Sequence, residues 1–345
     1  NKILKILHIT NFNERFYGRL HYNTGKRINN GFVRLGHNVL NISDRDIISN
    51  KKTILDPKAS RYLNNIIFQT VENFSPDIIV LGHADIVNQT TLINIKKKFN
   101  PYICQWFLDP LIVSGPDYIR NKKRILSLDK FIDATFLTTH PSAIKFKIKN
   151  PYFMPNPCDS SFETLNNSNN NTKKDLFFAM SHGVHRGILK SGKYDDREHF
   201  LKELSEELNN IEFDIFGMNN VQPIWGNQFI KTLSNYSMAL NLSRGSPIKY
   251  YSSDRIAQLM GNGLLTFIDI RTQLNKIITN KEAVFYNNLK DLIKKIYYFK
   301  NNSKKLKQIA SNGRIAYHKK FNSTIISQYI IDKTTNTKSK QKYSW

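Results

Sequence analysis

Residues 238–268 read MALNLSRGSPIKYYSSDRIAQLMGNGLLTFI, and this stretch decides the fold. It begins with an apolar run at 238–243, passes through a polar turn and a helix-like segment at 253–262, and ends in a second apolar run at 264–268. Two short apolar runs separated by a helix are typical of a βαβ unit with buried, parallel strands. The window therefore predicts a parallel sheet with a crossover helix.

The same alternation continues on both sides of this window. It predicts further strands at 3–10, 39–42, 76–82, 101–107, 134–137, 175–180 and 211–216. Helices are expected at 22–36, 58–73, 89–98, 195–209, 226–236 and within 288–332. Strands that alternate regularly with helices favour parallel sheets covered by helices on both faces.

A polar segment interrupts the alternation, where Pro155 and Pro157 are followed by an asparagine-rich run. Such a composition is typical of a linker or long loop, and the chain length suggests two domains. The predicted fold is therefore α/β, with two Rossmann-like parallel-sheet domains facing a cleft. The expected divisions are a first domain at 1–155, a linker or loop at 156–174, a second domain at 175–320, and a C-terminal helix and basic tail at 321–345.

The 345 residues include 51 Lys and Arg against 27 Asp and Glu, which gives a formal net charge of +24. The basic residues are dispersed in short clusters beside apolar positions, which favours solvated helix faces over a nucleic-acid stripe. The 2 cysteines, Cys104 and Cys158, are too few for a disulfide framework, so a reducing compartment is expected. Because no apolar run approaches the ~20 residues that cross a bilayer, we expect a soluble cytoplasmic protein.

Several catalytic motifs are missing or incomplete. No glycine-rich dinucleotide fingerprint follows the first strand, and no zinc-protease or serine-hydrolase motif is present. Residues 187–194 fit a phosphate-binding P-loop until Tyr194, which stands where a magnesium-binding Ser or Thr is needed. Asp44 and Asp46 have the spacing of a carboxylate pair that holds Mn²⁺ in some enzymes. Pairing of Arg45 with a neighbouring carboxylate explains that pattern as well, so no metal site is expected.

The turn before residue 256 carries the strongest indication of a binding site. Ser253 or Asp254 is expected to cap the following helix, and Arg255 adds a charge to the positive end of that helix. Together they predict an anion site at the carboxyl edge of the sheet, where ligands bind in open α/β folds. An ordinary capped βαβ unit is the alternative interpretation.

This window resembles the donor domain of nucleotide-sugar-dependent glycosyltransferases with the GT-B fold. The similarity is to the subgroup related to the CgeB spore-maturation protein and to the family-1 and family-4 transferases. Their motif reads roughly Arg-Phe-Glu-Ala-x-Ala-x-Gly before an apolar strand, and Arg255 and Gly263 match it. The family Glu that hydrogen-bonds the donor ribose falls on Gln258, which keeps a hydrogen-bonding group but loses the carboxylate.

Other segments agree with the resemblance over about residues 3–300. A Gly-His-x-Val pattern at 36–39 is similar to the start of the second strand in the family, and Asp109 lies in a turn that resembles one lining the cleft. The strand end at 216–217 matches the one beside the nucleotide base, and 181–183 matches the donor-phosphate loop. The resemblance implies an acceptor domain first and a nucleotide-sugar donor domain second.

The resemblance further implies a glycosyltransferase that needs no metal, because helix N-termini and cations stabilise the leaving diphosphate. The implied donor-binding residues are Ser181, His182, Gly183, Arg186, Lys190, Phe216, Gly217, Ser253, Asp254, Arg255 and Gln258. Within this set, Arg186, Lys190 and Arg255 are assigned to the phosphates, and Gly217 and Gln258 to the base and ribose. A catalytic base, where the reaction uses one, is expected among His83, Asp85 and Asp109 at strand ends of the first domain.

The implied partners follow from this reaction. The nucleotide-sugar is a substrate, so no cofactor is expected, and the acceptor is a glycan or a lipid-linked glycan of the cell envelope. Basic, aromatic surface on the first domain would suit a peripheral contact with the inner face of an anionic membrane. Two alternatives stay open: a sugar-nucleotide epimerase on the same fold, and a nucleic-acid-binding protein recruited by charge. The absence of clustered aromatics within a basic motif argues against specific nucleic-acid binding.

Overall fold

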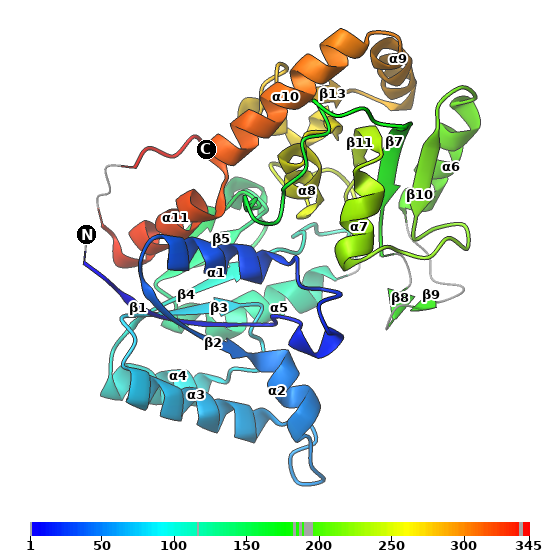
Figure 1. Cartoon of the computed structure of the whole chain (residues 1–345). Helices are drawn as coiled ribbons and strands as arrows, with labels where there is room; N and C mark the ends of the chain where they lie inside the picture. Colours follow the sequence, from blue (N-terminus) through cyan, green and yellow to red (C-terminus); the bar gives the residue numbers. More distant parts are fainter. Residues whose placement is uncertain (1, 116, 182–183, 186–187, 190–195, 338–340) are drawn as a thin grey trace. The chain divides into compact units, whose positions relative to one another are not determined.

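The computed structural model describes residues 2–115, 117–181, 184–185, 188–189, 196–337 and 341–345, with only the backbone described at 184–185 and 188–189. The chain divides into two compact units (Figure 1). Unit 1 comprises Asn1–Pro157 together with Phe321–Trp345, and unit 2 comprises Cys158–Lys320. The chain therefore leaves unit 1, completes unit 2, and then returns to unit 1.

Unit 1 holds a 6-stranded sheet in the order β2-β1-β3-β4-β5-β6, and every pairing in it is parallel. Its strands are β1 (Lys5–Thr10), β2 (Asn38–Ser43), β3 (Ile78–Gly82), β4 (Tyr102–Phe107), β5 (Ala134–Leu137) and β6 (Pro151–Phe153). In β1, Leu7 pairs with Leu40 of β2 on one side and with Ile79 of β3 on the other. Nearly all of β1 is buried, as expected for a parallel strand covered on both faces.

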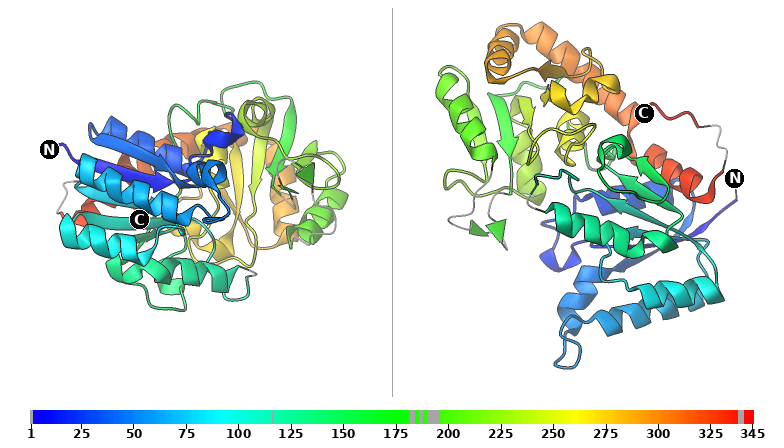
Figure 2. Two further views of the ribbon diagram at one scale, coloured as in Figure 1. Left: turned by 90° about the horizontal axis from the view of Figure 1, so that it is seen from below. Right: turned by 180° about the vertical axis from the view of Figure 1, so that it is seen from behind.

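Helices cover both faces of this sheet (Figure 2). Side chains of α2 (Asp44–Lys51), α3 (Ser60–Phe74) and α4 (Gln89–Lys98) share one core with Leu7 and Ile9 of β1. Side chains of α1 (Thr24–Arg34) and α11 (Ser323–Thr335) share the other core with Ile6. A further helix, α5 (Tyr118–Leu128), packs beside the ends of β4 and β5. The alternation of side chains along β1 thus feeds two separate cores.

Asparagine side chains start several helices. Asn23 and Asn88 accept hydrogen bonds from backbone N–H groups in the first turns of α1 and α4. Asn288 and Asn322 do the same for α9 (Leu289–Lys300) and α11. Each such cap satisfies a backbone donor that the helix cannot, and contributes about 1 kcal/mol.

The returning segment belongs to the core of unit 1, because α11 packs closely on α1. The Ser327 hydroxyl donates to the carbonyl oxygen of Ile28 at 2.7 Å. A Cβ atom on Gly31 would lie 2.1 Å from the carbonyl oxygen of Ser323, so only glycine leaves room for this contact. Beyond α11, the Trp345 ring packs on Tyr329 with 5.0 Å between ring centroids.

Unit 2 holds a 5-stranded sheet in the order β10-β7-β11-β12-β13, again with every pairing parallel. Its strands are β7 (Lys174–Ala179), β10 (Phe213–Phe216), β11 (Tyr236–Asn241), β12 (Leu265–Asp269) and β13 (Val284–Tyr286). A separate antiparallel pair is formed by β8 (Val184–His185) and β9 (Ile188–Leu189).

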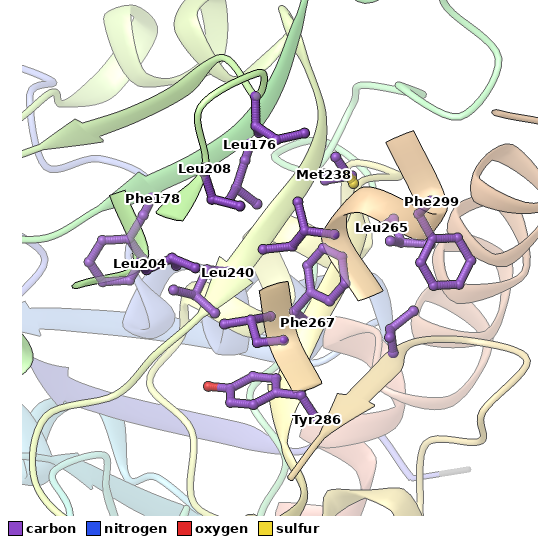
Figure 3. Close-up of a cluster of buried hydrophobic side chains, with 14 of the residues drawn as sticks. Leu176, Phe178, Leu204, Leu208, Met238, Leu240, Leu265, Phe267, Tyr286 and Phe299 are labelled. Carbon is purple, nitrogen blue, oxygen red and sulfur yellow. The ribbon is translucent and has the colours of Figure 1, made fainter. Parts of the chain in front are cut away.

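The unit 2 sheet also lies between two layers of helices. On one face, α6 (Arg197–Glu207), α9 and α10 (Ser303–Lys320) share a large apolar core with the strands; Leu176, Met238, Leu265 and Phe267 lie in it (Figure 3). On the other face, α7 (Gly226–Leu233) and α8 (Arg255–Gly261) cover a smaller core around Phe177.

The segment 156–174, predicted as a linker or long loop, lies within unit 2 from Cys158 onward. The side-chain amide of Asn167 donates to the carbonyl oxygens of Leu233 and Tyr236 at 2.9 and 2.8 Å. The sequence signal was the run of asparagines, which is typical of loops. Here one of those amides satisfies backbone acceptors at the end of α7 and the start of β11, which holds the segment in place.

The prediction of an α/β fold with two parallel-sheet domains is confirmed. Four elements were not predicted from the sequence: α2, α5 and the short strands β6 and β13. Within the described residues, none of the helices combines the length and apolar character that a membrane span requires.

Candidate functional site

The carboxyl edge of the unit 2 sheet holds most of the described residues that were predicted to bind a donor. From β7 the chain crosses to β10 on one side, and it then returns to β11 on the other side. This reversal makes a topological switch point at the carboxyl ends of β7 and β11, which is where ligands bind in open parallel sheets. The chain enters α8 just beyond this point.

Arg255 occupies the switch point. Its Nε donates to the carbonyl oxygen of Ala179 at the end of β7, at 3.1 Å, and its Nη1 donates to that of Leu242 after β11, at 2.9 Å. The guanidinium also stands over the Phe178 ring, 5.0 Å from its centroid. Arg255 therefore joins two strand ends and holds a fixed positive charge at the edge of the sheet.

Asp254, one of the two residues predicted to cap α8, does not cap it through its side chain. Asp254 stands at the N-cap with helical backbone angles, and its side chain makes no capping hydrogen bond. The Ser253 hydroxyl accepts from Arg255 Nη1 at 2.9 Å. Both residues are half-buried at the carboxyl edge, where the Ser253 hydroxyl supports the arginine.

Gly217 allows the ends of β10 and β7 to approach each other. Its φ is +87°, and a Cβ atom there would lie 1.8 Å from the carbonyl oxygen of Met180. The Met180 N–H donates to the carbonyl oxygen of Phe216 at 3.0 Å, which closes the two strand ends together. Any larger residue at 217 would both clash and strain the backbone.

The remaining residues predicted to bind the donor differ in their burial, and several of them lie outside the described side chains. Gln258 is half-buried and lies three residues after Arg255, so the two share one side of α8. Ser181 is exposed just beyond β7. The predicted residues His182, Gly183, Arg186 and Lys190, with the P-loop-like stretch 187–194, lie outside the described side chains. The phosphate loop therefore stays a prediction.

In unit 1 the corresponding switch point lies between β1 and β3, and the predicted base candidates lie along that edge. His83 follows β3 with a positive φ of 49° and stacks on Phe107 with 4.2 Å between ring centroids. Its Nε2 accepts the N–H of Leu108 at 2.7 Å. Burial lowers the pKa of His83, although Asp109 opposes this effect. The ring is therefore neutral, and its acceptor nitrogen is already occupied.

Asp85 and Asp109 differ in their partners. Asp85 forms ion pairs with Arg45 of α2 and, at 3.1 Å, with Arg124 of α5. Asp109 is half-buried at the end of β4 and makes no hydrogen bond or ion pair within the described part of the chain. Of the three predicted bases, Asp109 is thus the one whose carboxylate is not engaged by another described residue. The two arginines were not predicted, because only the fold brings α2 and α5 to this edge.

The two carboxylates of the Asp44-Arg45-Asp46 motif serve different purposes. Asp46 accepts from the Ser43 hydroxyl, from the Arg15 guanidinium at 2.8 Å and from two backbone N–H groups. Asp44 is fully buried; its Oδ1 accepts from the Arg45 N–H at 2.8 Å, and its Oδ2 has no described partner. Burial raises the pKa of Asp44 to about 6, although the hydrogen bond and charge of Arg45 oppose the shift. Arg45 pairs with Asp85, as the alternative interpretation of the motif expected of a neighbouring carboxylate.

A pocket of about 730 Å³ opens on the α7 face of unit 2. Lys174 and Tyr236 line it, and both hold Asp214 of β10, Lys174 at 2.6 Å. These two residues begin their strands, so most of the pocket lies toward the amino edge of the sheet. It shares only Phe216 with the predicted donor residues and is distinct from the Arg255 edge.

Comparison with known proteins places this architecture in a class. Residues 197–332 match the family model described as "Glycosyl transferase-like". Sucrose-phosphate synthase from Thermosynechococcus elongatus has a similar structure, with a TM-score of 0.59 and 10% identity over 96% of this chain and 98% of that one. A glycosyltransferase from Rickettsia africae has a TM-score of 0.57 and 12% identity, over 99% of this chain and 100% of that one. Anabaena HepE in complex with UDP and glucose has a TM-score of 0.56 and 12% identity, over 96% of this chain and 100% of that one. No curated protein sequence shows a significant match.

The two parallel-sheet units, each with its switch point, define an α/β protein of the GT-B class. Within the chain, the segment 197–332 carries the match to the glycosyl transferase-like family model, and the resemblance to GT-B glycosyltransferases is confirmed at the level of the fold. The resemblance to the CgeB subgroup stays a prediction.

Proposed function

We propose that this chain transfers a sugar from a nucleotide-sugar donor to a glycan or lipid-linked acceptor, and that protein cations stabilise the leaving diphosphate without a metal. The observation that carries the proposal is Arg255 at the switch point of unit 2, inside the segment that matches the glycosyl transferase-like family. The complex of Anabaena HepE with UDP and glucose supports a nucleotide-sugar as the donor class.

Arg255 suits this role because its position is fixed before any ligand arrives. Its bonds to Ala179 and Leu242 hold the guanidinium at the edge of the sheet. A preorganised charge stabilises a developing anion without the cost of reorienting a flexible side chain or water. Gln258 lies on the same side of α8 and supplies the hydrogen-bonding group that takes the place of the family Glu.

On the acceptor side, we assign proton removal to Asp109. Its carboxylate makes no described hydrogen bond, whereas Asp85 is paired with two arginines and His83 already accepts an N–H. A base must offer a free lone pair to the acceptor hydroxyl. His83 and the Arg45–Asp85–Arg124 cluster then act as positioning residues around it.

Donor binding is tested by thermal shift with UDP-, GDP-, ADP-, dTDP- and CMP-sugars in the presence of EDTA. We expect one nucleotide class to stabilise the chain, Gln258→Leu to reduce the shift, and Gln258→Glu to retain it. Gln308→Leu is the matched control, because Gln308 is exposed on α10. If no donor stabilises the wild-type chain, or if EDTA abolishes every shift, the proposal is wrong.

Transfer is tested with the stabilising donor and extracted glycans or lipid-linked glycans. Asp109→Asn is expected to keep the donor shift but to lower the transfer rate by about a hundredfold or more, as for loss of a general base. Acceptor-independent conversion of the donor sugar would identify an epimerase instead. Unchanged transfer by Asp109→Asn would remove the assigned base.

A further inference from the structure

The loop between α2 and α3 exposes two consecutive aliphatic side chains. Ile54 is 97% exposed and Leu55 is 88% exposed. The loop projects away from both helices at the bottom of Figure 1. Aliphatic side chains held in water are unfavourable, so an adjacent pair at the tip of a projecting loop indicates a surface that is covered by something else.

The loop is held in this shape by its own hydrogen bonds. Asp56 N–H donates to Thr53 Oγ1 at 3.0 Å, and Thr53 N–H donates to the Asp56 carbonyl oxygen at 3.2 Å. The Asp56 carboxylate accepts the N–H groups of Ser60 and Tyr62 at the start of α3, at 3.0 and 3.1 Å. These bonds close the turn on the helix end, so Ile54 and Leu55 are held outward by the backbone.

Exposed cations surround the aliphatic tip. Lys51, Lys52, Lys58 and Arg61 are all exposed, and none forms an ion pair within the described residues. The Lys51 ammonium stands over the Tyr62 ring, 5.6 Å from its centroid, and Tyr62 is itself 41% exposed. The one acidic residue of the loop, Asp56, is bound to the helix start. The segment 51–62 therefore presents an apolar tip within a positively charged rim.

The segment lies at the functional edge of unit 1. The other end of α3 is at the amino edge of the sheet, because Lys5 at the start of β1 donates to the carbonyl oxygen of Phe74 at 3.0 Å. A helix of this length reaches across the sheet. The start of α3 is accordingly at the carboxyl edge, where Asp85 and Asp109 lie.

We propose that the segment 51–62 docks unit 1 on an anionic lipid bilayer, with Ile54 and Leu55 inserted among the acyl chains and the cations on the headgroups. A bilayer accepts a small apolar tip with a basic rim. A protein partner would need a far larger contact, on the order of 800 Å² per side. Nucleic acid would bind the cations but leave both aliphatic side chains in water.

The test is sedimentation of the full chain with vesicles of phosphatidylcholine alone and of equal parts phosphatidylcholine and phosphatidylglycerol. We expect binding to the anionic vesicles only. The double variant Ile54→Ser/Leu55→Ser should lower the partition coefficient by roughly ten- to a hundredfold. Lys52→Gln/Lys58→Gln should lower it by several-fold and remove part of its dependence on salt. Ile315→Ser, at a 61% exposed position on α10, is the matched control and should bind as the wild type does.

Insertion itself is measured with Leu55→Trp, whose fluorescence should shift to the blue on anionic vesicles. The proposal is overturned if no vesicle binds the chain, if the serine variant binds as well as the wild type, or if Ile315→Ser loses as much. Self-association that disappears in the serine variant without any vesicle binding would assign the tip to a second copy of the chain and would likewise overturn it. The proposal does not rest on the transferase activity, because it is argued from the segment 51–62 alone. The donor thermal shift of the serine variant is measured separately and should match that of the wild type.

Discussion

Replacing Asp44 with asparagine should make the chain more stable at neutral pH. Asp44 is fully buried, and no described group partners its Oδ2 atom. Burial raises its pKa from 3.8 to about 6, so the folded state holds the proton more tightly than the unfolded state does. Stability from this group is fully present below about pH 4 and is lost as the pH rises through about 6.

The magnitude follows from the shift in pKa. Roughly two units correspond to about 3 kcal/mol, which is the cost of ionising Asp44 in the folded chain at pH 8. An asparagine side chain at this position would keep the oxygen that accepts the Arg45 N–H and would carry no charge. The free energy of unfolding of Asp44→Asn, relative to wild type, should therefore increase by about 3 kcal/mol between pH 4 and pH 8.

Urea unfolding at both pH values measures this difference, and Asp46→Asn is the matched control two residues along the same helix. Burial opposes ionisation of Asp46, but its hydrogen bonds with Ser43, Arg15 and the backbone outweigh that effect and hold its pKa below the ordinary value. Asp46→Asn should thus destabilise at neutral pH, by about 2–4 kcal/mol. If the two variants change stability in the same direction at pH 8, or if Asp44→Asn shows no dependence on pH, the reasoning is wrong.

Two further predictions concern unit 1. Gly31→Ala should destabilise the chain by about 2–4 kcal/mol in urea unfolding, because its Cβ atom would lie 2.1 Å from the Ser323 carbonyl oxygen. The control Asn30→Ala, on the same helix, should change the free energy of unfolding by about 1 kcal/mol or less. Equal effects of the two substitutions would show that close packing at Gly31 is not the cause. Burial lowers the pKa of His8 from 6.5 to about 4, although its hydrogen bond with Asn29 opposes the shift. The free energy of unfolding of the wild type should therefore decrease by about 3 kcal/mol as the pH falls from 6.5 to about 4. His8→Gln should flatten that part of the stability curve, and a curve with the wild-type slope would show that another group titrates there.

The fold could be predicted well from the sequence, because a parallel strand that is buried on both faces is a nearly continuous apolar run. The strand at 134–137 was predicted with the bounds that it has in the structure, and the helix within 253–262 was found as α8. The elements that were not predicted have weaker sequence patterns. β13 is only three residues long, and α2 begins within a motif that was interpreted for its carboxylates.

The site was predicted less completely, since roles depend on partners that only the fold brings together. Arg255 was expected to bind phosphate, but nothing in its neighbouring residues indicated that it would also join the ends of β7 and β11. Asp85 was expected as a base, and only the placement of Arg45 and Arg124 reveals that its oxygens are engaged. Asp44 was noted for metal binding, whereas its burial is visible only in the structure.

The division of unit 1 into two segments has a consequence for biosynthesis. As the chain emerges from the ribosome, residues 1–157 appear before unit 2, but α11, which packs on Ile6, Ile28 and Phe32, is translated only after all of unit 2. Domains generally fold as units during synthesis, so unit 2, which is contiguous, can be finished while unit 1 still lacks part of its hydrophobic interior. That unfinished face is exposed to water for the time needed to translate the whole of unit 2, and during that interval its apolar side chains favour aggregation of the nascent chain.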